Sequence, residues 1–118
     1  MKPEERDSDL YLEDILLAMT RIQEYVNNLD FVQFKRDYKT VDAVIRNFEI
    51  IGEASKNVSI AIKNNYPSVP WEEMYRLRNR ISHEYFGIDY EIIWSIISEN
   101  LPDNRKQIQL ILDEVRKE

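Results

Sequence analysis

Residues 40–64 read TVDAVIRNFEIIGEASKNVSIAIKN. Apolar side chains recur three or four positions apart along this stretch, which is the spacing of an amphipathic helix. The main apolar row consists of Val41, Val44, Ile45, Phe48, Ile51, Val58 and Ile62. A second, weaker row lies on the opposite side and consists of Ala43, Ile50, Ala54 and Ala61. Gly52, Ser55 and Ser59 lie on the main row and are small enough to let a second helix approach closely. We therefore predict a central helix from about Thr40 to Asn64, contacted on two sides.

The same spacing continues toward the N-terminus. A first helix is predicted to start at Asp7, Ser8 or Asp9, which are all competent caps, and to end near Asn27–Asn28. Its inward face consists of Leu12, Ile15, Leu16, Met19, Ile22 and Val26. A short turn or helix from Phe31 to Arg36 leads from it to the central helix.

The C-terminal half also has helical spacing. Pro70 suits the first turn of a helix that runs from about Trp71 to His83, and Gly87 is a plausible stop after it. Asp89 is expected to cap a helix that ends at Asn100. Pro102 then opens or kinks a last helix, whose inward residues are Ile108, Ile111, Leu112 and Val115.

Length and composition bound the possible fold and chemistry. The 118 residues suit one domain, so we expect an all-α, up-and-down bundle of four main helices plus a short helix over residues 1–118. The chain contains no cysteine, which excludes disulfides, thiolate zinc sites and cysteine nucleophiles. A di-iron bundle needs two Glu-x-x-His pairs, but His83 is the single histidine and Arg80 stands three positions before it. We expect neither a metal site nor a cofactor.

Charge and hydropathy limit the partners. The formal net charge of −6 argues against a protein that coats nucleic acid over its whole surface, although it permits a local basic site. The first residues lack the order of a signal peptide, and no apolar run approaches the ~18 residues that would span a bilayer. We therefore expect a cytoplasmic protein without membrane contact.

One segment departs from this acidic composition. Residues 74–83 read MYRLRNRISH, with three arginines and no acid. At about 100° per residue, one polar face of the predicted helix contains Arg76, Asn79, Arg80 and His83. Arg78 lies on the other side, with Trp71, Met74, Ile81 and Ser82. A charge on a packed side needs a partner or a function.

Two interpretations of this segment stay open from the residues. Arg78 forms a buried ion pair with Glu49 or Glu53, or it faces a phosphate in a cleft at a dimer interface. His83 is a helix-end residue bonded to Asn79, or it is an acid–base catalyst, because an ordinary imidazole titrates near pH 6.5.

The functional interpretation has a coherent chemistry. A guanidinium matches two phosphate oxygens, and an imidazole moves a proton near neutral pH. Together Arg78 and His83 suit the cleavage of RNA by its own 2′-hydroxyl group, which requires no metal. One histidine cannot easily serve as base and acid in one step, so the acid is Tyr85, a water molecule or the His83 of a second chain.

At this point the residues resemble a known family. Residues 78–85, RNRISHEY, resemble the R-x4-H-x-Y signature of HepT-type toxins in the HEPN superfamily. Residues 48–56, FEIIGEASK, are similar to the central-helix block of that family. Pro70-Trp71 resembles its entry to the motif helix, and residues 83–89 resemble the turn that follows. The blocks occur in family order, and the resemblance extends over nearly the whole chain.

The resemblance implies a homodimeric ribonuclease toxin whose two motif helices line a positive cleft. It implies that Arg78 and His83 are the catalytic pair and that Asn79 supports them. Tyr85 matches the tyrosine that a cognate MNT-type nucleotidyltransferase antitoxin adenylylates in such systems. A phosphate-bearing adduct there would repel and obstruct incoming RNA.

Other assignments depend on which function is correct. As a nuclease, the chain would bind RNA through Arg76 and Arg80. The alternatives are a non-catalytic, substrate-binding subunit of a two-component nucleotidyltransferase and a structural helical adaptor. A second basic run, formed by Lys35, Arg36, Lys39 and Arg46, is either a solvated helix face or part of the RNA path. We expect the aromatic residues Tyr66, Trp71, Phe86 and Trp94 to be core or interface residues rather than base-stacking platforms.

Overall fold

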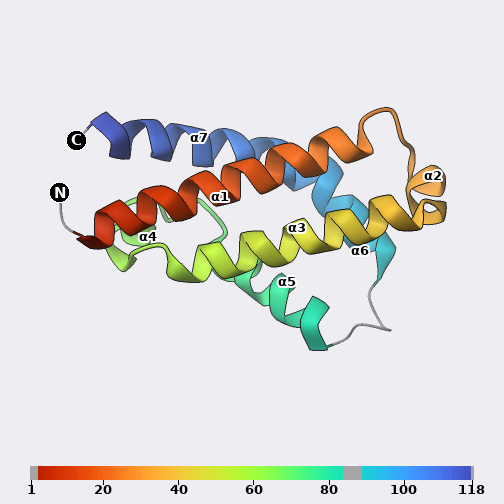
Figure 1. Cartoon of the computed structure of the whole chain (residues 1–118), viewed down its shortest axis with the longest axis horizontal. Coiled ribbons are helices and arrows are strands. Elements are labelled where there is room, and N and C mark those ends of the chain that lie inside the picture. Colours follow the sequence, from red (N-terminus) through yellow and green to blue (C-terminus); the bar gives the residue numbers. More distant parts are fainter. Residues whose placement is uncertain (1–2, 84–88, 118) are drawn as a thin grey trace.

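The computed structural model describes residues 3–83 and 89–117, and the side chains of residues 8–80 and 89–117. All regular secondary structure in these ranges is helical, which confirms the predicted all-α class. Figure 1 shows the long helices α1 (Pro3–Val26), α3 (Tyr38–Asn57) and α7 (Leu101–Lys117) side by side, with α1 between the other two. The helix α5 (Trp71–His83) packs mainly against α3 and projects away from this layer.

Helical periodicity correctly predicted the inward faces of the long helices. In α1, Leu12, Ile15, Met19 and Ile22 are buried, while Leu16 and Val26 are partly buried. In α7 the buried residues include Ile108, Ile111, Leu112 and Val115, all of which were predicted to point inward. Apolar side chains from α1, α3 and α7 therefore meet in one core, which stabilises the bundle by removing their surface from water.

The predicted start of the first helix is wrong. The helix begins at Pro3, where the missing N–H of proline is harmless because the first turn has no partner for it. Ser8 is only 1% exposed and lies inside α1, where its hydroxyl accepts a hydrogen bond from the N–H of Ser59 at 2.9 Å. The predicted end is confirmed, because α1 stops at Val26 and Asn28 adopts a left-handed backbone with φ 69°.

The predicted central helix is two helices. The first of them, α3, ends at Asn57. Val58 and Ser59 are extended, and the short helix α4 (Ile60–Asn65) begins after them. Ser59 causes this interruption, because its hydroxyl accepts from the N–H of Ile62 and caps α4. The N–H of Ser59 is meanwhile satisfied by Ser8 rather than by a helix carbonyl. The prediction of contact on two sides is confirmed, since α3 packs against both α1 and α5.

The C-terminal helices join differently from the prediction. Asp89 caps α6 (Tyr90–Ser95) as expected, accepting from the N–H of Glu91 at 2.8 Å. No break follows, because a π-helical turn at Ile96–Asn100 runs directly into α7. The N–H of Leu101 donates to the carbonyl of Ile96, five positions back. This wider turn lies directly before Pro102, whose ring would collide with the carbonyl four positions back in a regular α-helix. The predicted stop at Gly87 lies outside the described residues.

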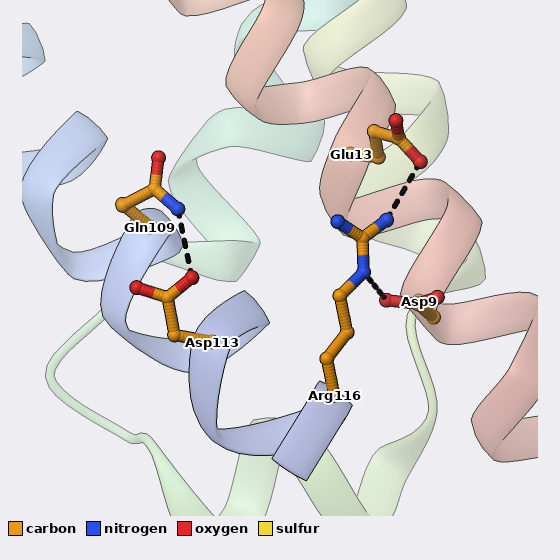
Figure 2. A network of polar contacts seen from close by, with 5 residues as sticks. All are labelled: Asp9, Glu13, Gln109, Asp113 and Arg116. Atoms are coloured by element: carbon orange, nitrogen blue, oxygen red, sulfur yellow. Dashed lines mark hydrogen bonds and ion pairs between the residues drawn. The ribbon is translucent and has the colours of Figure 1, made fainter.

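Charged contacts fix the end of α7 to the start of α1. Arg116 contacts Asp9 through Nε and Glu13 through Nη2, each at 2.8 Å (Figure 2). The hydrogen bond that Arg116 donates to Asp9 is the main reason that the pKa of Arg116 is raised above its ordinary value. On the same helix, Gln109 donates to Asp113 at 3.0 Å. The two contacts of Arg116 join α7 to α1 at the end of the bundle opposite α2 (Phe31–Arg36).

Three of the four aromatic residues predicted to be core or interface residues are confirmed as core, since Trp71 is buried and Tyr66 and Trp94 pack against the core. Phe34 of α2 is fully buried, and its ring centroid lies 5.1 Å from that of Trp94 on α6. The ring centroid of Phe31 lies 6.3 Å from that of the same indole. Trp71 is buried, and its indole N–H donates to the carbonyl of Tyr66. Phe86 lies outside the described residues.

Candidate active site

The helices α3 and α5 touch at Gly52. A Cβ at this glycine would lie 2.2 Å from the Cβ of Arg78 and 2.9 Å from the carbonyl oxygen of Met74. Real Cβ atoms are not found at such distances, so the backbones approach this closely only because residue 52 lacks a side chain. This confirms the prediction that small residues on the central helix admit a second helix, and it places the stem of Arg78 against α3.

The guanidinium of Arg78 has two polar partners. Its Nη2 lies 3.4 Å from Oε2 of Glu53, and its Nη1 donates to Oδ1 of Asn79 at 3.1 Å. Of the two acids predicted as partners, Glu49 and Glu53, the ion pair forms with Glu53. The pair is not buried as expected, because the side chain of Arg78 is 34% exposed and that of Glu53 is 53% exposed. A solvent-exposed pair contributes only about 0–1 kcal/mol to stability.

A groove of about 260 Å³ opens beside this ion pair. Residues of α1, α3 and α5 line it, namely Tyr11, Asp14, Arg46, Glu49, Ile50, Glu53, Ala54 and Arg78. The lining combines two guanidinium groups with three carboxylates and one phenol. Arg78 is thus packed along its stem and open at its charged end, which is the arrangement required for contact with an anionic ligand.

Sequence reasoning missed part of this groove. Tyr11 and Asp14 come from α1, and nothing in their local sequence marks them as neighbours of Arg78. Arg46 belongs to the second basic run, for which a solvated face and an RNA path were both considered. It is exposed and lines the same groove as Arg78, whereas Lys35, Arg36 and Lys39 are exposed elsewhere on α2 and α3.

The other arginines of α5 face solvent. Arg76 forms an i,i+4 ion pair with Glu72 at 3.6 Å, with both side chains 69% exposed. Arg80 is exposed as well, and Asn79 is partly buried against Arg78. The backbone of His83 completes α5, but its side chain and all of Tyr85 lie outside the described residues.

Two further observations concern the described residues. Among the described side chains, those of residues 8–80 and 89–117, no three His, Cys, Asp or Glu groups are placed to hold a metal ion. No helix in the described part of the chain combines the length and apolarity needed to cross a membrane.

The sequence profile of the ribonuclease HepT-like family matches residues 15–111, which include the whole of α3 and α5, the second half of α1 and most of α7. The chain belongs to this family. The predicted HepT-type family is therefore confirmed, and membership in it indicates ribonuclease activity. No solved structure matches the chain.

Relatives from several organisms are similar to this HepT-like chain over most of its length. It is 44% identical over 113 residues to "Putative RNase MJ0127" of Methanocaldococcus jannaschii, covering 96% of this chain and 93% of that protein. It is 46% identical over 92 residues to "Probable ribonuclease HepT" of Thermococcus cleftensis, covering 78% and 84%. It is 39% identical over 102 residues to "Putative RNase TTE0752" of Caldanaerobacter subterraneus, covering 86% and 91%.

Proposed function

We propose that this chain is the toxin of a type II toxin–antitoxin pair and a metal-independent endoribonuclease. The supporting observation is Arg78, which is held on the motif helix with its guanidinium open to a groove, in a chain of the HepT-like ribonuclease family. A fixed cation open to solvent is what a phosphodiester needs at the point of cleavage.

In the proposed reaction, a base removes the proton of the 2′-hydroxyl group, and the resulting oxygen attacks the adjacent phosphorus. Arg78 stabilises the negative charge that accumulates on the phosphate oxygens. The bond to the 5′ oxygen breaks, and an acid protonates that oxygen as it leaves. The products are a 2′,3′-cyclic phosphate and a free 5′-hydroxyl group. His83 is one of the two proton carriers, and the other is Tyr85, a water molecule or the His83 of a second chain.

The protein is proposed to act as a homodimer in the cytoplasm. A second copy would supply a second imidazole, which removes the need for one histidine to give and take a proton in the same step. The shape of the chain supports this, because α5 projects from the bundle and packs mainly against α3. We propose that Arg76 and Arg80, which are both exposed on α5, contact the RNA backbone.

Control of the toxin is proposed to act at Tyr85. A cognate MNT-type nucleotidyltransferase adenylylates this residue, and the added phosphate repels RNA beside the catalytic pair. The variant Tyr85→Phe should therefore receive no adenylyl group, and it should remain toxic in the presence of the antitoxin where the catalytic acid is a water molecule or the His83 of a second chain. If the antitoxin still neutralises Tyr85→Phe, adenylylation of this residue is not the mechanism of control.

The chemistry can be tested with one RNA oligonucleotide in EDTA. The full-length protein should cleave it and leave a cyclic phosphate, and a single 2′-deoxy substitution at the cut position should stop cleavage there. His83→Ala should abolish both cleavage and toxicity. Cleavage of the 2′-deoxy position, or activity only after a divalent metal is added, would contradict the proposal. A protein that binds its nucleotidyltransferase tightly but cuts no RNA would instead be a substrate-binding subunit.

A further inference from the structure

Arg78 is held from two helices at once. Its own helix α5 supplies Asn79, which accepts from Nη1. The neighbouring helix α3 supplies two consecutive residues, Gly52 against the Cβ and Glu53 against Nη2. Both ends of one side chain are thus fixed by adjacent positions of α3, which lies outside the arginine–histidine segment.

We propose that Gly52 and Glu53 form a support for Arg78 and that Glu53 is a positioning residue, which aims the guanidinium into the groove. We refer to these two residues as the Arg78 support. The inference rests on the proposed ribonuclease function and extends it to a residue of α3.

The energetics favour positioning over stability as the role of the ion pair. The exposed pair contributes only about 0–1 kcal/mol to folding, so the fold does not depend on it. An unrestrained arginine side chain carries about 2 kcal/mol of rotamer entropy, and a bound orientation must overcome that entropy. Glu53 reduces this cost in advance by holding the charged end before RNA arrives.

The contact leaves the guanidinium able to bind a phosphate. A guanidinium has five N–H donors, and Arg78 contacts Glu53 and Asn79 through one nitrogen each. Neither contact is bidentate, so N–H groups remain for phosphate oxygens. Glu53 can therefore stay in place while Arg78 engages the substrate.

The same carboxylate has an opposite effect on binding. A negative charge next to the scissile phosphate repels it, so Glu53 weakens the binding of RNA while it orients Arg78. Removing the charge should lower KM and lower kcat together. A residue that only stabilises the fold would not produce this combination.

The chain offers a matched control in Glu49, one turn earlier on α3. Glu49 lines the same groove and forms no ion pair with another described residue. Glu53→Gln and Glu49→Gln therefore remove the same charge from the same groove, but only the first removes the ion pair with Arg78. A third variant, Glu53→Asp, keeps the charge on a side chain that is one methylene shorter.

The kinetic test compares these three variants on one RNA oligonucleotide. Both glutamine variants should lower KM, and only Glu53→Gln should also lower kcat, by between about tenfold and a hundredfold, which is the effect of misplacing a catalytic group by about 1 Å. Glu53→Asp should lower kcat and leave KM near the wild-type value. Equal kcat values for Glu53→Gln and Glu49→Gln would overturn the proposal.

A second measurement does not require activity. In protein with ¹⁵N-labelled arginine, the Nε–H signal of Arg78, assigned with Arg78→Lys, should report restricted motion of the guanidinium. The restriction should be lost in Glu53→Gln and kept in Glu49→Gln, and identical signals in the two variants would refute the Arg78 support. If the wild type cuts no RNA, the proposed function fails, and this measurement still decides whether Glu53 positions Arg78.

Discussion

Replacing Gly52 by alanine should destabilise the protein, although alanine is the better helix former. The added Cβ would lie 2.2 Å from the Cβ of Arg78 and 2.9 Å from the carbonyl oxygen of Met74. Neither atom is the flexible end of a side chain, so α5 itself has to move. The substitution thus tests the closest contact between the bundle and the motif helix.

The expected magnitude follows from two opposing effects. Overpacking a well-packed contact costs about 1–3 kcal/mol, and a collision with main-chain atoms belongs in the upper half of that range. Exchanging glycine for alanine inside a helix returns about 1 kcal/mol. The net loss in the free energy of unfolding should therefore be about 1–2 kcal/mol.

Urea unfolding followed by far-UV circular dichroism measures this loss. The midpoint should fall while the slope m stays unchanged. The penalty should shrink in an Arg78→Gly background, which removes the colliding Cβ and Cγ of Arg78, and should be additive with the distant Arg116→Ala. A Gly52→Ala variant as stable as the wild type would refute the packing argument.

Three further predictions concern binding, acid stability and the core. Arg76→Ala should reduce the slope of log K against log salt by about 0.7 for a single-stranded, uncleavable RNA, as measured by fluorescence anisotropy; an unchanged slope would show that Arg76 contacts no phosphate. The hydroxyl and N–H of Thr40 donate to the carboxylate of Asp37 and lower the pKa of Asp37 below the ordinary 3.8. The ionised carboxylate therefore stabilises the fold above pH 3.8, and this stabilisation is lost as the pH falls through the lower pKa of the folded state. Asp37→Asn should accordingly lower the urea midpoint at neutral pH, and less so well below pH 3.8, whereas a constant difference would contradict this. Phe34→Ala should cost about 3–5 kcal/mol in urea unfolding, because it leaves a cavity against Trp94; a loss below about 1 kcal/mol would mean that the site collapses to fill the space.

Helical periodicity predicted most of the fold because it reports directly which face of each helix is buried. It could not locate the interruption after Asn57, since Val58 and Ile62 continue the apolar row across it. The interruption depends on a hydrogen bond from Ser59 to Ser8, which lies 51 positions away. Periodicity carries no information about such a long-range bond.

The candidate site was predictable where it depends on one helix. The spacing of α5 placed Arg78 on the packed side and restricted its acidic partner to two residues, of which Glu53 forms the pair. The groove was not predictable, because Tyr11 and Arg46 meet Arg78 only after α1, α3 and α5 have packed together. The partial exposure of the ion pair likewise depends on how far α5 projects from the bundle.

The catalytic roles of Arg78 and His83 are best decided by the cleavage rates of four matched proteins on one RNA in EDTA. The set comprises the wild type, Arg78→Ala, His83→Ala and Arg116→Ala, the last of which removes an ion-paired arginine from the opposite end of the bundle. Arg116→Ala should cut at the wild-type rate, and the other two variants should lose cleavage while remaining folded. Undiminished cleavage by folded Arg78→Ala or His83→Ala would show that the residue concerned is not catalytic.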